Sequence, residues 1–187
     1  FAHLQRVYVT PNRSKYKQPS LSGFKAKQPF ILFLGQVSGD TAVNFSHFKV
    51  TGSDTSAHYV KAMLTAFPVL NAWGIPIIYK PHPREASGYN AAINELLEGP
   101  LFKNVTVCRD ASIHELFPQC LGVVSINSGA AFEALLHLKP VVTLGAVDYS
   151  GATLNCKNVQ EIEKALAFIQ QPVDEMKTKK FLHAYLA

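Results

Sequence analysis

The sequence alternates short apolar runs with stretches that carry helix signals, and this alternation constrains the fold more than any other feature. The apolar runs lie at 29–37, 75–79, 105–109, 122–127 and 140–145. The helix-like stretches lie at 53–72, 89–98, 112–117, 128–138, 159–170 and 173–186. Short β-rich runs separated by helices of about ten residues indicate βαβ units and a parallel sheet. We therefore predict an α/β fold, a Rossmann-like doubly wound parallel sheet, in which Pro68 bends or ends the first helix.

Charge divides the chain into a basic lead segment and a nearly neutral remainder. Residues 1–39 contain six of the 18 Lys and Arg residues and no acid, whereas residues 40–187 contain the other 12 bases and all 13 acids. The nearly neutral remainder argues against a nucleic-acid partner. We predict a basic lead segment at 1–28, a Rossmann-like domain at 29–171 and a C-terminal helix at 172–187. The Pro, Ser and Gln content of the lead segment favours a solvated linker.

The cellular setting is predicted from what the sequence lacks. No run approaches the roughly 18 apolar residues of a membrane span. The three cysteines form no C-x-x-C pair, which is typical of structural thiols in a reducing cytoplasm. We expect a cytoplasmic protein, with the basic lead segment and the lysines of the last helix as candidates for peripheral contact with the inner membrane. Because the first residue is Phe1, we also expect the chain to be part of a longer protein.

Polar residues follow the predicted strands, at the edge where ligands of such sheets bind. They are Gln36 and Asp40 after the first strand, Lys80, His82 and Arg84 after the second, Asn127 and Ser128 after the fourth, and Tyr149 after the fifth. Donors and cations dominate this set, which suits an anionic ligand. The sequence has no G-x-G-x-x-G, Walker A or G-x-S-x-G motif, and its histidines show no metal-ligand spacing. We therefore expect neither a cofactor nor a metal.

The segment that begins at Ser128 is the strongest local signal for a phosphate site. A serine at a helix start, followed by Gly129 and other small residues, lets a phosphate approach unpaired backbone N–H groups. The alternative is an ordinary N-cap. Glu133, about one and a half turns into the helix, is placed to accept hydrogen bonds from ribose hydroxyls or to be a surface carboxylate.

Two further loops carry candidate chemistry. Prolines flank His82 and fix the backbone of Lys80-Pro81-His82-Pro83, so the imidazole is held at a strand end, where it can donate to a phosphate or act as a general acid. Lys80 can supply charge to the same phosphate. Asp40 is either a turn former or a nucleophile or base.

Four segments occur in the order seen in a known family. They are Ser14-Lys15-Tyr16, ILFLGQVSGDTAV (31–43), IIYKPHP (77–83) and SGAAFEALLHLKPVVTLG (128–145). Over roughly residues 14–155 the chain resembles bacterial capsule polysaccharide biosynthesis and export proteins, specifically the retaining β-Kdo transferases that use CMP-Kdo. This resemblance implies the C-terminal, donor-binding half of a GT-B glycosyltransferase, with the acceptor half preceding Phe1 and a lipid-linked or saccharide acceptor.

The resemblance also implies roles for individual residues. His82 and Ser128, with Lys80, Asn127 and Gly129, would bind the CMP phosphate, and Glu133 would help to hold the nucleotide. Gln36, Arg84 and Tyr149 would lie near the sugar. Asp40 would be the nucleophile of a double displacement, with His82 as its catalytic partner. No metal is required in this scheme, since cations and N–H groups neutralise the leaving phosphate.

The sequence departs from the family pattern at three places. Leu138 stands where the family usually has Gly, Gly39 replaces an acid, and the stretch 150–154 lacks a Trp-Gly pair. Two alternatives therefore stay open beside a Kdo transferase of capsule or exopolysaccharide synthesis. One is a sialyltransferase-like CMP-sugar enzyme, and the other is a non-catalytic assembly or export factor.

Overall fold

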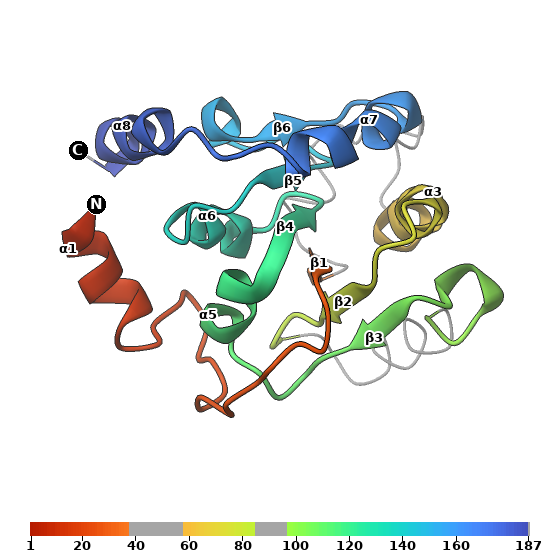
Figure 1. The fold of residues 1–187 in the computed structure, drawn as a ribbon, viewed down its shortest axis with the longest axis horizontal. Coiled ribbons are helices and arrows are strands. Elements are labelled where there is room, and N and C mark those ends of the chain that lie inside the picture. The colour runs from red at the N-terminus through yellow and green to blue at the C-terminus, as the bar shows by residue number, and fades with distance from the viewer. Residues whose placement is uncertain (38–57, 85–96, 187) are drawn as a thin grey trace.

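The fold is built on a six-stranded sheet in which every strand is parallel to its neighbours (Figure 1). A computed structural model describes residues 1–37, 58–84 and 97–186. The strand order is β3-β2-β1-β4-β5-β6. The strands are β1 Phe30–Leu34, β2 Ile77–Lys80, β3 Val105–Val107, β4 Cys120–Ser125, β5 Val141–Thr143 and β6 Leu154–Asn155. The predicted Rossmann-like sheet is confirmed, and β6 is a two-residue strand that the apolar pattern did not indicate.

Helices and short helical turns connect the strands. They are α1 Ala2–Leu4, η1 Gln5–Val9, α3 His58–Ala72, η3 Pro100–Phe102, α5 Ile113–Leu116, η4 Phe117–Gln119, α6 Gly129–Leu135, η5 Ser150–Ala152, α7 Val159–Ile169 and α8 Glu175–Leu186. The helix α3 continues through Pro68 to Ala72, so Pro68 does not end the helix, and the alternative that it bends the helix stays a prediction. Most of the predicted helix 89–98 lies outside the described residues.

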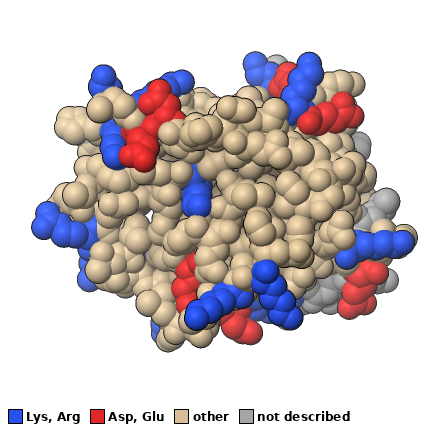
Figure 2. Space-filling model, viewed as in Figure 1, with Lys and Arg blue, Asp and Glu red and all other residues tan. Residues whose placement is uncertain are grey.

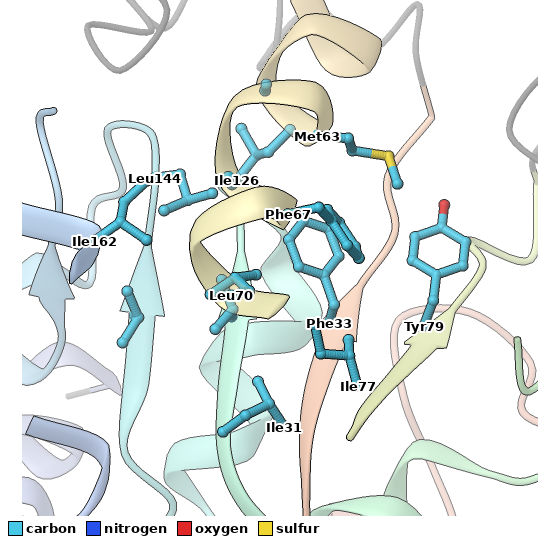
Figure 3. Close-up of a cluster of buried hydrophobic side chains, with 14 of the residues drawn as sticks. Ile31, Phe33, Met63, Phe67, Leu70, Ile77, Tyr79, Ile126, Leu144 and Ile162 are labelled. Carbon is cyan, nitrogen blue, oxygen red and sulfur yellow. The ribbon is translucent and has the colours of Figure 1, made fainter. Parts of the chain in front are cut away.

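The sheet is buried on both faces, as the near-continuous apolar runs require. Ile31 and Phe33 of β1 point to one face, where they pack with Phe67 of α3 and Ile162 of α7 (Figure 3). Phe30, Leu32 and Leu34 of the same strand belong to a second apolar cluster, which includes residues of α5, α6 and α8. Because successive side chains of a strand alternate in direction, one five-residue run contributes to both layers.

The lead segment packs against the second layer. Phe1, Leu4 and Phe24 contact its apolar cluster. Polar groups bond to it as well: Gln5 Nε2 donates to the Leu136 carbonyl at 2.9 Å, and Gly23 N–H donates to Glu115 Oε1 at 2.7 Å. A solvated linker therefore does not describe residues 1–28, because their polar groups find partners on the domain. The boundaries at 28 and 171 stay predictions.

The register brings three strand ends to one level. Leu34 at the end of β1 pairs with Lys80 of β2 on one side and with Ser125 of β4 on the other. From β1 the chain first adds β2 and β3 on one side and then β4, β5 and β6 on the other. Doubly wound sheets open a crevice for ligands at the point where the strand order reverses in this way, here between β1 and β4. Gly35 follows directly, and a Cβ there would lie 2.6 Å from the Tyr79 hydroxyl and 3.0 Å from the Lys80 carbonyl. Only glycine allows this close approach of β1 to β2.

Candidate functional site

A cavity of about 260 Å³ lies beyond the ends of β1, β2 and β4, at the point where the strand order reverses. Seven of the ten predicted site residues line it: Gln36, Lys80, His82, Asn127, Ser128, Gly129 and Glu133. Arg84 and Tyr149 are not among the lining residues, and Asp40 lies outside the described residues. The edge rule for parallel sheets therefore located the cavity from the sequence.

Gln36 and Asn127 fix the floor of the cavity. Gln36 Nε2 donates to Asn127 Oδ1 at 2.6 Å, and the Asn127 backbone N–H donates to Gln36 Oε1 at 2.8 Å. This pair of bonds joins the second residue after β1 to the second residue after β4. Gln36 is almost fully buried, so its amide holds the two strand ends at a fixed separation.

Ser128 is the N-cap of α6, and its Oγ accepts a hydrogen bond from Ala130 N–H at 3.3 Å. Tyr149 supports this turn from behind: its hydroxyl donates to the Ser128 carbonyl at 2.5 Å, and burial raises the pKa of the phenol. The ring of Tyr149 is buried against Phe132. The structure therefore does not bring Tyr149 to the cavity, where a sugar-binding residue was expected, because its hydroxyl is used to hold the start of α6.

Gly129 leaves one side of the cavity open. A Cβ at this position would meet no heavy atom within 4 Å, in contrast to the crowded Gly35. Packing therefore does not explain this glycine, and its missing side chain adds space next to the backbone of the Ser128 turn.

His82 projects from the loop after β2 with a defined orientation. The Arg84 backbone N–H donates to His82 Nδ1 at 3.1 Å, so in the neutral ring the proton is on Nε2. The ring of Tyr16 packs edge-on against the imidazole, with centroids 4.6 Å apart. Two independent contacts thus hold the imidazole that was predicted to meet a phosphate.

Lys80 is buried at the end of β2. Its Nζ donates to the Arg109 carbonyl at 2.6 Å, and burial is the main cause that lowers the pKa of the ammonium. An ammonium has three N–H donors, so the bond to Arg109 leaves it able to serve an anion as well. Burial destabilises this cation, and the charges of Asp110 and Glu115 oppose that effect only in part, so an anionic ligand would stabilise the ammonium further.

The lead segment supplies a wall that the sequence analysis missed. Ser14, Lys15, Tyr16 and Gln18 all line the cavity. The Ser14 hydroxyl donates to Glu133 Oε1 at 2.7 Å, and Gln18 Oε1 accepts from the Ile113 N–H at 3.2 Å. Ser14-Lys15-Tyr16 was one of the segments that resembled the family, and it was the signal that pointed to this wall. The Pro, Ser and Gln content of the lead segment was given more weight than this motif, so a linker was predicted.

Glu133 is engaged by protein groups. Its Oε1 accepts from Ser14, and its Oε2 is buried, 3.6 Å from His114 Nε2. Burial raises the pKa of this carboxyl, and the Ser14 and Lys15 hydrogen bonds oppose that rise. In this geometry Glu133 holds the lead segment. Its predicted contact with a ribose stays a prediction.

Two histidines lie beside this carboxylate. His114 Nε2 lies 2.6 Å from the Arg13 carbonyl, and His114 Nδ1 lies 2.9 Å from His137 Nε2. Because a carbonyl only accepts, His114 carries its proton on Nε2 when neutral, and His137 then donates from its own Nε2. Burial lowers the pKa of His114, and burial together with His114 and Lys139 lowers the pKa of His137 to about 4.

A second, wider cleft of about 680 Å³ adjoins the cavity. Arg84 belongs to this cleft, and its guanidinium lies 4.8 Å from the centroid of the Tyr16 ring. Tyr16 and His82 line both spaces and therefore form the boundary between them. On the face shown in Figure 2, most basic side chains lie near the edge, several of them beside acids, and one lies near the middle.

Other features of the described part of the chain bear on the expected partners. Within residues 1–37, 58–84 and 97–186, no three His, Cys, Asp or Glu side chains are grouped so that they could hold a metal ion. No described helix has both the length and the apolar character needed to cross a membrane.

Comparisons with known proteins agree with this architecture. A β-Kdo 2,4-transferase, KpsC of Thermosulfurimonas dismutans, superposes with a TM-score of 0.58 at 17% identity, covering 95% of this chain and 52% of the other. A β-Kdo 2,7-transferase, also KpsC of that organism, gives 0.52 at 24% identity, with coverage of 87% and 50%. The UDP-GlcNAc 2-epimerase of Methanocaldococcus jannaschii gives 0.53 at 15% identity, with coverage of 84% and 45%.

These identities show a shared fold, and the chain spans about half the length of the structures that it resembles. A search of curated proteins finds no match. The family model for capsule polysaccharide biosynthesis proteins matches residues 3–186, which is nearly the whole chain. The chain therefore belongs to the capsule polysaccharide biosynthesis protein family.

Proposed function

We propose that this chain is the donor-binding part of a glycosyltransferase of capsular polysaccharide biosynthesis. It takes a sugar such as Kdo from a CMP-sugar and passes it, with retention, to a lipid-linked or saccharide acceptor. The observation that carries the proposal is the cavity at the reversal point of the strand order, where His82, Lys80 and the Ser128 turn meet. Membership of the family supplies the process in which such a site would work.

The nucleotide phosphate is the natural occupant of this meeting point. His82 can donate from Nε2, because its Nδ1 already accepts from Arg84 N–H. Lys80 brings a buried positive charge, and the open side of Gly129 lets an oxygen approach the backbone. Such fixed donors stabilise the charge that develops on a leaving phosphate, which is how this site would lower the barrier.

The chemical step is assigned to Asp40. Its carboxylate would attack the anomeric carbon of the sugar and release CMP, and an acceptor hydroxyl would then displace the carboxylate, so that two inversions give retention. Asp40 is four residues past Gln36, which lies on the cavity floor. Arg84 lies two residues after His82 and lines the wider cleft next to the cavity, where it would meet the carboxylate of an acidic sugar.

Calorimetric titration with nucleotides tests the donor. We expect CMP to bind with a Kd on the order of 0.1–1 mM, and UDP, ADP and NAD to bind more weakly. UDP selectivity would keep a glycosyltransferase but discard a CMP-sugar. If no nucleotide bound to a chain that includes the acceptor half, an assembly or export factor would be the better assignment.

Two variants separate binding from turnover. His82→Ala should weaken CMP binding, and an unchanged affinity would remove the phosphate role from His82. Asp40→Asn should keep CMP affinity and abolish transfer in the full-length protein. A variant that still transfers sugar would exclude Asp40 as the nucleophile.

A further inference from the structure

A chain of hydrogen bonds runs from the end of α6 through α5 to the lead segment. His137 follows α6, and its Nε2 lies 2.9 Å from His114 Nδ1, while His114 Nε2 lies 2.6 Å from the Arg13 carbonyl. Burial lowers the pKa of both imidazoles, so both rings are neutral near pH 7. Because a carbonyl only accepts, each ring donates from its Nε2, and the chain has one direction, from His137 to His114 to Arg13.

The imidazole of His114 is fixed from several sides. The helix α5 that carries it begins with a capping box, in which Ser112 Oγ accepts from the His114 N–H and Glu115 accepts from the Ser112 N–H. The Phe117 ring packs edge-on against the imidazole with centroids 6.2 Å apart, and the His137 ring lies 5.2 Å away. A donor that packing and hydrogen bonds hold in this way determines where its acceptor lies.

That acceptor, the Arg13 carbonyl, begins the stretch of the lead segment that forms the cavity wall. Ser14, Lys15 and Tyr16 follow it directly and line the cavity. Tyr16 packs edge-on against His82, with centroids 4.6 Å apart. Figure 1 shows this part of the lead segment passing beside α5. A displacement of the Arg13 carbonyl would therefore also displace the ring that supports His82.

We infer that His114 is a positioning residue for the proposed nucleotide site and that His137 acts through it. Neither His114 nor His137 is among the residues that line the cavity. His114 holds the Arg13 carbonyl and thus the backbone that presents Tyr16 to His82, and His137 keeps the proton of His114 on Nε2. A wall held before the nucleotide arrives reduces the ordering that binding must impose. The effect on nucleotide binding rests on the proposed donor-binding function, whereas the hold on the lead segment rests on these contacts alone.

Two substitutions separate the N–H donor of His114 from the bulk of its ring. His114→Phe keeps an aromatic ring against Phe117 but cannot donate, so the wall should be in place less often and CMP affinity should fall on the order of threefold to tenfold. His114→Gln ends in an N–H donor at a similar distance from the backbone, and its CMP affinity should stay within about twofold of the parent. Calorimetric titration measures both, and a His114→Phe protein with the affinity of the parent would overturn the positioning role.

Tryptic cleavage reports on the lead segment without any nucleotide. Arg13, Lys15 and Lys17 are exposed cleavage sites in this stretch. Trypsin should cut after them faster in His114→Phe than in the parent protein or in His114→Gln, because local opening exposes the backbone to the protease. Bound CMP should slow these cuts in the parent. Equal cleavage of His114→Phe and the parent would show that the imidazole does not hold the segment.

Ile162→Val is the control for a general loss of stability. Ile162 belongs to the apolar cluster on the opposite face of the sheet, and removing one buried methyl group there destabilises the fold without contact to the lead segment. Thermal unfolding ranks the variants by stability. If Ile162→Val lost CMP affinity and gained tryptic cleavage as His114→Phe does, both effects would come from global instability, and the inference would be overturned.

A double-variant cycle tests whether His137 acts through His114. His137→Leu removes the donor to His114 Nδ1 and should weaken CMP binding less than His114→Phe does. The double variant should bind CMP no more weakly than His114→Phe alone, since His137 then has nothing left to position. Losses that multiply would give His137 a separate role. A parent protein that binds no CMP would overturn the proposed donor and the nucleotide role of His114 with it, while the tryptic assay would still decide whether His114 holds the lead segment.

Discussion

The Ser14 hydroxyl donates to Glu133 Oε1 at 2.7 Å, joining residues that are 119 positions apart in the chain. Ser14 belongs to the lead segment and Glu133 to α6, and both line the cavity beyond the strand ends. This bond holds Lys15 and Tyr16 where they can form the cavity wall. The buried carboxylate of Glu133 thus attaches the cavity wall to the Rossmann-like domain.

Removing this bond should affect both stability and binding. Ser14→Ala leaves Glu133 Oε1 without its hydroxyl donor in a buried place, which should cost about 1–2 kcal/mol of unfolding free energy. It should also weaken CMP binding, because Tyr16 loses part of its support. The control is Ser22→Ala, since Ser22 donates to Glu115 Oε2 at 3.2 Å in an exposed place outside the cavity. Denaturant unfolding and calorimetry should show only a small loss of stability and of CMP affinity for Ser22→Ala. Equal losses in Ser14→Ala and Ser22→Ala would contradict the role given to the Ser14–Glu133 hydrogen bond.

Alanine substitution of the two glycines of the cavity should have different effects: lost CMP affinity at Gly129 and lost stability at Gly35. Gly129→Ala meets open space, so stability should change by less than about 1 kcal/mol, whereas the added methyl should reduce CMP affinity. Gly35→Ala would place a Cβ 2.6 Å from the Tyr79 hydroxyl and should destabilise the protein by about 1–3 kcal/mol. Unfolding curves and titration with CMP measure both effects. A stable Gly129→Ala protein with unchanged affinity would remove the Ser128 turn from the binding site.

The backbone conformation of Leu138 shows why glycine suits this position, where the sequence departs from the family pattern. It has φ of 53°, in the left-handed region, just after α6, where the Lys139 N–H bonds to the Ala134 carbonyl at 3.1 Å. A glycine adopts this conformation without strain, and other L-residues are less stable there by roughly 1–2 kcal/mol. Leu138→Gly should therefore be more stable than Leu138→Ala by about 1 kcal/mol. Thermal unfolding of the pair isolates the backbone effect, because both lack the leucine side chain, and the reverse order would refute it.

Acid should destabilise the protein partly through His137. Its pKa lies at about 4 in the fold and near 6.5 when unfolded, so between these values the unfolded state binds the proton first. Stability is therefore lost as the pH falls through this window, by at most about 3.5 kcal/mol at about 1.4 kcal/mol per pKa unit. The raised pKa of Glu133 acts in the opposite direction, because its folded form takes up a proton more readily.

The variant His137→Asn isolates the contribution of this histidine to the pH dependence. It should flatten the decline of unfolding free energy between pH 6.5 and 4 relative to the parent protein. Denaturant unfolding at several pH values measures the two curves. Parallel curves would show that His137 does not titrate in this window.

The sequence predicted the architecture well because the signals were local. Apolar runs such as 122–127 and helix starts such as Ser128 depend on neighbouring residues, and the rule for strand ends then placed Lys80 and His82 at one edge. Tyr149 and the lead segment were placed wrongly for the opposite reason. Whether Tyr149 faces the cavity or supports a turn depends on Ser128, which lies 21 residues away in the chain. Whether the lead segment packs on the domain depends on Glu133, which lies 119 residues from Ser14.

The order in which the parts of the site are synthesised has a consequence for folding. Ser14 and Arg13 of the lead segment leave the ribosome about a hundred residues before Glu133 and His114, the residues that hold them. Closing so long a loop costs entropy that local contacts do not repay, so the wall should dock only after the sheet has formed. The nascent chain would then pass through a stage in which the sheet is assembled but the cavity still lacks the wall that Ser14, Lys15 and Tyr16 supply, and the lead segment is accessible to proteases.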